Sequence, residues 1–426
     1  MNTSNKFTKT IAVLLCIALL STMLTGCGSK AQALTSDAEY VTVAQEKICQ
    51  DHTDALADIS YQMFRKVAAQ ETENIVMSPL SAWFALSMTG QGANGETKEE
   101  FAWFSKRMDD DLQSDLAAWM MEYLEQTYGA DNESVQVGVA NSVWVDDAMT
   151  VNTEFVDIVK AYYRAQVISQ DLQAHGAVDN VNNWISDATK ERIQNMLDQI
   201  DANAVMLLIN ALTLDAKWQT EFDIANTHEG VFYLPDSKEV NKDFMHRRIT
   251  NGTYLSWDGG EGVVLPYQGE NMAMIALLPD ANSTYTDVID KLSSAWLYDL
   301  QDNRTECIVQ LSMPKFKMES KLNLNDMCQN MGLELAFDAE NADFSNLGTA
   351  DNGTNIYIGR VLQNCMLEVG EEGTKAAAAT VVEMRCGSAF IDPSKIVNLT
   401  LDRPFVYLVV DTETQIPLFT GVYQGE

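Results

Sequence analysis

The chain has 426 residues, and its 28 Lys and Arg residues against 61 Asp and Glu residues give a formal net charge of −33. Hydrophobic residues make up 46% and charged residues 21%, and these globular proportions exclude a disordered or collagen-like chain. An acidic balance this strong repels phosphate and anionic headgroups, which excludes nucleic-acid binding through a basic patch.

The first 26 residues have the pattern of an export signal. Lys6 and Lys9 precede the apolar run 11–20, which is too short to span a bilayer as a stable helix. Small residues then lead directly to Cys27, which resembles a bacterial lipobox, in which the cysteine receives a lipid and becomes the new N-terminus. An ordinary secretory signal with an incidental cysteine is the alternative. We therefore expect residues 1–26 to be a lipoprotein signal peptide.

The remaining chain is expected to be one anchored domain. Each buried methylene of an acyl chain contributes about 0.8 kcal/mol, so lipid on Cys27 would hold the protein to the bacterial cell membrane or cell surface. Residues 27–45 are predicted to form the lipidated N-terminus and a tether, and 46–426 a single domain, because no repeat or composition shift marks a boundary. The cysteines are sparse and contain no CxxC, so the hydrophobic core must supply the stability.

The predicted elements are mixed in type. Ser78 and Pro79 mark a helix start, as an N-cap and a first helical residue. Helices are predicted over 56–67, 80–88, 155–165, 181–197 and 322–331, and strands over 135–145, 205–214, 263–267, 272–278, 307–317, 405–410 and 418–423. Helices dominate the first half and strands the second, which predicts an α+β domain rather than alternating βαβ units.

Enzyme motifs are weak in this sequence. Residues 90–95 match GxGxxG, but a helix start rather than a strand precedes them, so the glycines are interpreted as a helix C-cap and a turn. The four histidines have no metal-ligand spacing. A Ser/His/Asp triad stays open, since its members are distant along a chain, but nothing favours it. We expect no enzyme activity, no metal and no cofactor.

The informative segment is 367–380, which ends in four alanines and a threonine. Its local composition favours a short surface helix. The segment also resembles the reactive-loop hinge of the serpin family, and similar likenesses follow in family order along the chain. They lie at 74–81, 92–97, 182–185, 189–193, 210–218, 265–267, 274–280, 313–317, 402–405 and 418–421.

The resemblance implies a serpin-like fold, with helices packed on a large mixed central β-sheet, smaller sheets, and an exposed reactive loop at about 371–400. It implies an irreversible, suicide-type inhibitor of serine proteases, in which loop cleavage is followed by insertion of the hinge as a strand. The target would be a trypsin-, elastase- or subtilisin-like protease, or a cysteine protease, and the inhibitor a monomer. The alternative is a non-inhibitory binding or scaffold lipoprotein with the same fold.

The hinge composition favours insertion. The resemblance assigns the hinge to Glu371, Gly373, Thr374, Ala376, Ala377, Ala378, Ala379 and Thr380. Side chains alternate between the two faces of a sheet, so Thr374, Ala376, Ala378 and Thr380 would face the core and Lys375 the solvent. All four core positions are small and uncharged, and so would not overpack the sheet. Roughly fourteen inserted residues would move a bound protease by about 46 Å.

The bait bond is placed by counting along the chain from the hinge. Counting about seventeen positions from Glu371, as in the family, places it at Gly387–Ser388. Met384, Arg385 and Cys386 are the alternatives if the cut is shifted. Because glycine suits few specificity pockets, the sequence leaves the target open.

The resemblance also assigns residues that control opening of the sheet. Trp218 would lie where insertion begins, and is equally well interpreted as a large core aromatic. The cluster known in this family as the shutter would consist of Ser78, Ser81, Asn210 and Gln363. Gln363 stands where the family often has histidine, so it can hydrogen-bond to Asn210 or Ser78 without being titratable.

Overall fold

The computed structural model describes residues 31–104, 108, 110–202, 204–351, 353–375 and 396–425. The α-helices of this part are α2 (Gln50–Ala68), α3 (Pro79–Gly92), α4 (Gly95–Phe104), α5 (Asp110–Tyr128), α6 (Thr153–Tyr163), α7 (Ala177–Ala188), α8 (Tyr285–Lys291), α9 (Ser294–Asp302) and α10 (Asn325–Asn330). None of them is both long and apolar enough to cross a bilayer.

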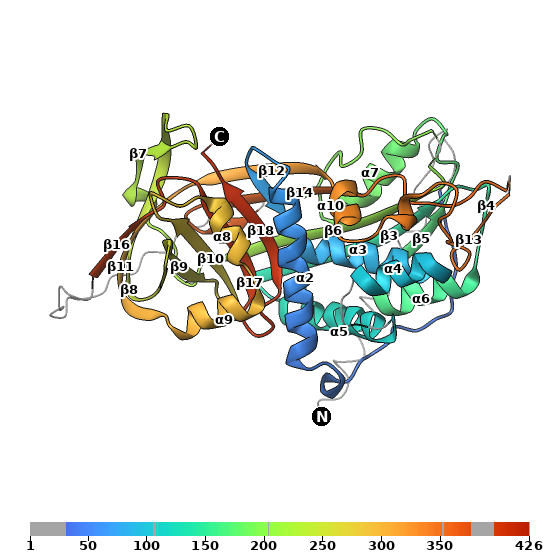
Figure 1. Cartoon of the computed structure of the whole chain (residues 1–426), viewed down its shortest axis with the longest axis horizontal. Coiled ribbons are helices and arrows are strands. Elements are labelled where there is room, and N and C mark those ends of the chain that lie inside the picture. Colours follow the sequence, from blue (N-terminus) through green and yellow to red (C-terminus); the bar gives the residue numbers. More distant parts are fainter. Residues whose placement is uncertain are drawn as a thin grey trace, which may run out of the picture.

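The long central sheet has seven strands in the order β1–β5–β3–β6–β15–β14–β12. Figure 1 labels β3, β5, β6, β12 and β14 of this sheet. Its strands are β1 (Gln32–Ala33), β3 (Val135–Val145), β5 (Gln166–Ser169), β6 (Met206–Lys217), β12 (Phe316–Asn323), β14 (Leu362–Val369) and β15 (Gly373–Lys375). β6 is antiparallel to β3 along its length, and its residues 209–214 are buried on both faces, as the nearly continuous apolar run predicts.

A second sheet fills the other end of the molecule. Its path is β16–β11–β8–β9–β10–β17–β18–β2, with β7 paired to β8, and a small third sheet joins β4 to β13. The strands are β2 (Ile75–Met77), β7 (Thr227–Tyr233), β8 (Glu239–Trp257), β9 (Gly260–Pro266), β10 (Met272–Pro279), β11 (Thr305–Pro314), β16 (Ile396–Thr400), β17 (Phe405–Asp411) and β18 (Pro417–Tyr423), with β4 (Met149–Val151) and β13 (Gly348–Ala350) in the third. The α+β prediction is thereby confirmed.

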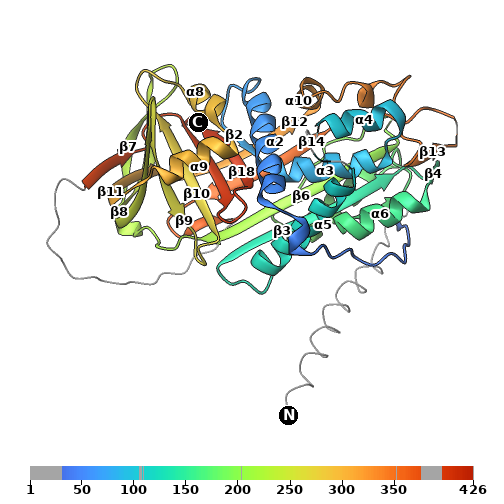
Figure 2. The same cartoon turned by 60° about the horizontal axis from the view of Figure 1, so that its bottom comes forward.

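The two faces of the central sheet pack against different helices. Figure 2 shows α3 to α6 gathered beside β3 and β6. Leu212 and Leu214 of β6 belong to the main core, together with the apolar residues of α2 to α6. Ile209 and Ala211 of β6 face the other way and form a separate cluster with Val181 and other apolar residues of α7 and its following loop. Successive side chains along a strand point to opposite faces of the sheet, which explains this division.

The helix expected over 322–331 begins only at Asn325, since Leu322 and Asn323 belong to β12, and two other predicted boundaries are also wrong. The helix expected over 181–197 ends at Ala188, because the hydroxyl of Thr189 accepts the Ile193 amide proton and turns the chain away. The strand expected over 307–317 is two strands, broken at Lys315, since β11 pairs with β8 of one sheet and β12 with β14 of the other. In both places the chain follows tertiary contacts rather than local periodicity.

Two further expectations are corrected at loops. Gly90 and Gly92 lie inside α3, and the C-cap residue is Ala93 rather than a glycine. Of the expected glycine C-cap and turn, only the turn is found, at Gly95 with a φ of +53°. The described part of the tether expected over 27–45, residues 31–45, is not a free segment. Gln32 and Ala33 pair with β5 instead, and from there the chain packs along the domain with Val43 buried.

Candidate functional site

The first hinge residues form β15, a short strand between β6 and β14. Thr374 pairs with Ala216 of β6 and with Val369 of β14, antiparallel to both. Thr374 is 1% exposed, so it faces the core, as the alternation of the hinge predicts. Residues 373–375 and 396–400, which were expected to lie in the exposed loop, are instead strands of this sheet and of the other.

Gly373 begins β15 at a point where no side chain fits. A Cβ atom there would lie 2.0 Å from the carbonyl oxygen of Ala216 and 2.8 Å from the Cα of Lys217. Both atoms belong to the backbone of β6 and could move only by distorting the ladder. The close approach of two backbones therefore requires glycine at this position.

Trp218 follows β6 and anchors the chain just before the hinge. Its indole N–H donates to the carbonyl of Gly370 at 2.9 Å, and its backbone N–H donates to Glu372 at 2.9 Å. The indole stacks on Tyr267 with ring centroids 4.5 Å apart and an interplanar angle of 5°. The Tyr267 hydroxyl in turn lies 2.5 Å from the hydroxyl of Thr374. Trp218 is thus a fully buried core aromatic that also contacts the chain at the start of the hinge.

Glu371 fixes the start of the hinge electrostatically. Its carboxylate lies 2.9 Å from the ammonium of Lys315 and accepts a hydrogen bond from the Thr227 hydroxyl at 3.0 Å. Burial alone would raise the pKa of this carboxyl, but the hydrogen bonds from Lys315 and Thr227 outweigh burial and hold the pKa below its usual value. Its carbonyl also accepts the Phe222 amide proton at 2.8 Å.

A second polar cluster lies further along the strands, where α3 begins. Gln363 of β14 accepts from the backbone N–H of Ser78 at 3.1 Å and donates to the Ser78 carbonyl at 2.8 Å. Of its two expected partners, Gln363 thus uses Ser78. Asn210 of β6 instead accepts from the Ser81 hydroxyl and donates to Asn141 of β3. All these side chains are buried, so the cluster joins α3 to both strands.

Between these two sites runs what we call the seam, the line between β6 and β14 beyond β15. Both strands pair with β15, and their described residues form no hydrogen-bonded ladder with each other. A cavity of about 20 Å³ lies next to Thr374, lined by Leu214 and Leu367 among others. Another, of about 30 Å³, lies beside Asn210 and Gln363. The seam thus offers unpaired strand edges but little free volume.

The rest of the predicted site lies outside the described residues. This holds for hinge residues Ala376, Ala377, Ala378, Ala379 and Thr380, for Met384, Arg385, Cys386, Gly387 and Ser388 around the bait bond, and for Cys27. Within the described part, no group of three or more His, Cys, Asp or Glu side chains is arranged to hold a metal ion.

Sequence reasoning missed three partners of the hinge and of the polar cluster. Tyr267 and Lys315 lie inside segments that resemble the family, but neither was assigned a contact. Asn141 lies in a correctly predicted strand, and its polar side chain within a largely apolar run is the one sequence signal that could have indicated a buried hydrogen-bonding role. Their contacts join positions more than fifty residues apart, so no local pattern could reveal them.

The family follows from comparison with known proteins. A sequence model described as "Serpin (serine protease inhibitor)" matches residues 54–424. The chain belongs to the serpin family. The solved native structure of the thermophilic serpin Tengpin covers 93% of this serpin and 100% of its own chain, with a TM-score of 0.83 and 30% identity. Serpin-ZXA of Oryza sativa subsp. japonica is 31% identical over 362 residues, covering 82% of this chain and 89% of its own. Iripin-8 of Ixodes ricinus is 28% identical over 390 residues, covering 89% and 96%.

Proposed function

We propose that this serpin is an irreversible inhibitor of a serine or cysteine protease. The protease would cut the loop that follows β15, and the hinge would then extend β15 down the seam between β6 and β14, carrying the acylated protease with it. The observation that supports this proposal is the register of β15, because the hinge already occupies the first positions of such a strand.

Continuing that register pairs each core-facing hinge residue with a suitable neighbour on both sides. Ala376 falls between Leu214 and Leu367, Ala378 between Leu212 and Cys365, and Thr380 between Asn210 and Gln363. All six neighbours are buried. The alanines would enter an apolar stretch without overpacking it, and the Thr380 hydroxyl would meet two side-chain amides able to hydrogen-bond with it. The chemistry of the hinge therefore matches that of the seam position by position.

The test is incubation with trypsin-, elastase-, subtilisin- and papain-like proteases, followed by denaturing electrophoresis. A complex that survives SDS and is larger by the mass of the protease is expected for the native chain. Thr374→Arg would force a charge into a buried position beside Tyr267, so cleavage without a stable complex is expected. Lys375→Arg keeps the charge at the neighbouring position of opposite parity and is the matched control.

The outcomes separate the two candidate functions. Clean nicking of the native chain by every protease, with no gain in heat resistance, would overturn the inhibitor and favour a binding or scaffold protein. A complex formed equally well by Thr374→Arg would overturn insertion as the mechanism. N-terminal sequencing of the released fragment identifies the bait bond, and thereby decides between Gly387–Ser388 and a cut shifted to Met384, Arg385 or Cys386.

We further propose that the protein is exported and anchored through lipid on Cys27. A few residues separate Cys27 from β1, where Gln32 pairs with Ser169 of β5. Ser169 pairs with Val145 of β3, and Val145 pairs with Met206, the first residue of β6. The hinge instead pairs with the last residue of β6, eleven residue steps or about 36 Å further along the strand. The bait would therefore be presented at the end of the sheet remote from the membrane.

Labelling with a fatty-acid analogue in a bacterial host tests the anchor. Incorporation that is lost in Cys27→Ser is expected, and the substituted protein should leave the membrane fraction. Label that persists in Cys27→Ser would contradict lipid attachment at this residue, without bearing on protease inhibition.

A further inference from the structure

The chain between α7 and β6, residues 189–205, crosses the seam. Arg192 and Ile193 of this linker line the cavity next to Thr374, together with Leu214 of β6 and Met366 of β14. The linker therefore lies directly over the positions into which the hinge would extend.

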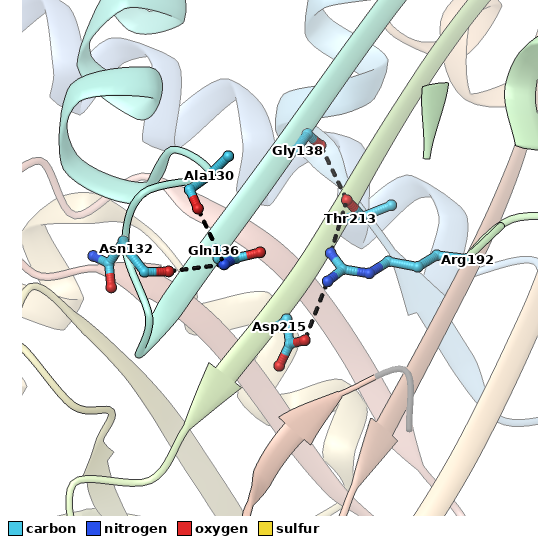
Figure 3. Close-up of polar contacts among 7 residues, drawn as sticks. All are labelled: Ala130, Asn132, Gln136, Gly138, Arg192, Thr213 and Asp215. Atoms are coloured by element: carbon cyan, nitrogen blue, oxygen red, sulfur yellow. Dashed lines mark hydrogen bonds and ion pairs between the residues drawn. The ribbon is translucent and has the colours of Figure 1, made fainter. Parts of the chain in front are cut away.

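One end of the linker is fastened to β6 by Arg192 (Figure 3). The guanidinium donates to the carboxylate of Asp215 at 3.1 Å and to the hydroxyl of Thr213 at 3.5 Å, and this hydroxyl donates to the carbonyl of Gly138 on β3 at 3.5 Å. The Arg192 side chain is only 17% exposed and that of Asp215 30%, so water and salt weaken this ion pair less than a fully exposed one. We call Arg192, Thr213 and Asp215 the clasp.

The other end of the linker is fastened across the seam. The carboxylate of Asp198 lies 3.7 Å from the ammonium of Lys321 on β12, and both side chains are exposed, so this pair is weak. Between the two ends, Leu197 is buried and exchanges two backbone hydrogen bonds with the side chain of Asn182 on α7. The linker is thus held to strands on both sides of the line that has to open.

Inserting a strand moves β6 and β12 apart by about one strand spacing, 4.8 Å. A linker held to both cannot keep all its contacts, so insertion must break the clasp or the Asp198–Lys321 pair. The clasp is the better shielded of the two and lies over the part of the seam that would open first, next to Thr374. Lys375 pairs with Glu368 of β14, and continuing the register of β15 with β6 places Lys375 opposite Asp215. Asp215 would therefore have the ammonium of Lys375 as a new cationic neighbour once Arg192 leaves.

We propose that Arg192 is a positioning residue whose release from Asp215 and Thr213 limits the rate at which a strand enters the seam. This inference rests on the proposed inhibitory function, because it concerns the same insertion. It predicts that the clasp tunes the competition between insertion and completed cleavage, and hence how many inhibitor molecules are consumed for each protease inhibited.

The test measures insertion without a protease. A synthetic peptide with the sequence of residues 376–387 is added in excess to the full chain, and its annealing is followed by native electrophoresis. Arg192→Ala and Arg192→Gln should anneal the peptide about fivefold faster than the native chain, and Arg192→Lys should restore most of the native rate. Lys190→Ala is the matched control, since Lys190 is an exposed cation of the same linker with no ion pair among the described residues.

Salt supplies a readout that a merely structural role would not move. Annealing to the native chain should accelerate between low salt and about 0.5 M NaCl, whereas annealing to Arg192→Gln should change much less. Equal rates for the native chain, Arg192→Ala and Arg192→Gln would overturn the role of the clasp while leaving protease inhibition intact. Failure of the peptide to anneal to any of these chains would contradict insertion itself, and with it both proposals.

Discussion

The hydroxyl groups of Tyr267 and Thr374 lie 2.5 Å apart at the top of the seam, and neither residue is more than 1% exposed. Burial raises the pKa of the Tyr267 hydroxyl well above its usual value, so this group stays neutral at any physiological pH. Since Tyr267 also stacks on Trp218, a single aromatic pair connects the end of β6 to the first buried residue of the hinge.

Tyr267→Phe should lower the free energy of unfolding by about 1 kcal/mol, because it removes the hydrogen bond to Thr374 and keeps the stacked ring. Urea unfolding followed by tryptophan fluorescence measures the change. Tyr233→Phe is the control, since Tyr233 is 42% exposed and should change stability by no more than a few tenths of a kcal/mol. Equal effects of the two substitutions would show that the buried hydroxyl pair does not stabilise the hinge.

The contribution of Glu371 to stability should depend on pH. Because its folded pKa is lowered, the stabilisation is fully present above the usual carboxyl pKa and is lost as the pH falls through the folded value. Glu371→Gln should therefore be less stable than the native chain at pH 7, and the difference should shrink as the pH falls below the usual carboxyl pKa. Unfolding in urea across this range measures it. Exposed Glu239→Gln should match the native chain throughout, and a Glu371→Gln difference independent of pH would refute the assignment.

Gln363→Leu should destabilise the native fold by about 1–3 kcal/mol. Leucine has similar bulk but cannot accept the backbone N–H of Ser78, which would be left buried without its partner. Thermal unfolding of this variant and of the exposed control Gln194→Leu provides the comparison. A Gln363→Leu chain as stable as the control would mean that the Ser78 amide finds another partner, and that Gln363 does not secure the seam.

The proposed register can be tested by cross-linking. Position 378 would lie directly opposite Cys365 after insertion, at a Cα separation that suits a disulfide. Ala378→Cys should therefore form a disulfide with Cys365 after the loop is cut, and Ala379→Cys, of opposite parity, should not. Joining two thiols is a two-electron oxidation, so an oxidant is added to take up the electrons. Burial raises the pKa of the Cys365 thiol to about 12, which slows the reaction, and peptide mass mapping detects the bond. A disulfide from Ala379→Cys instead would shift the register by one residue.

Local regularities in the sequence were enough to place many elements. The strand β6 was predicted from its nearly continuous apolar run, and the strand Val135–Val145 from its mostly β-branched and small residues. Ser78 and Pro79 gave the start of α3 correctly, since capping depends on neighbours along the chain. The alternation of the hinge likewise predicted that Thr374 is buried.

Long-range contacts decided the rest. Lys315 separates two strands because different sheets bind the residues on either side of it, and the linker after Ala188 leaves its helix to lie across β6. The hydrogen bonds of Gln363 with Ser78 rather than with Asn210 depend on which groups folding brings within 3.5 Å of each other. The same holds for the ion pair between Arg192 and Asp215. Periodicity and capping act between near neighbours in the chain, whereas hydrogen bonds and ion pairs act between neighbours in space, which a linear pattern does not encode.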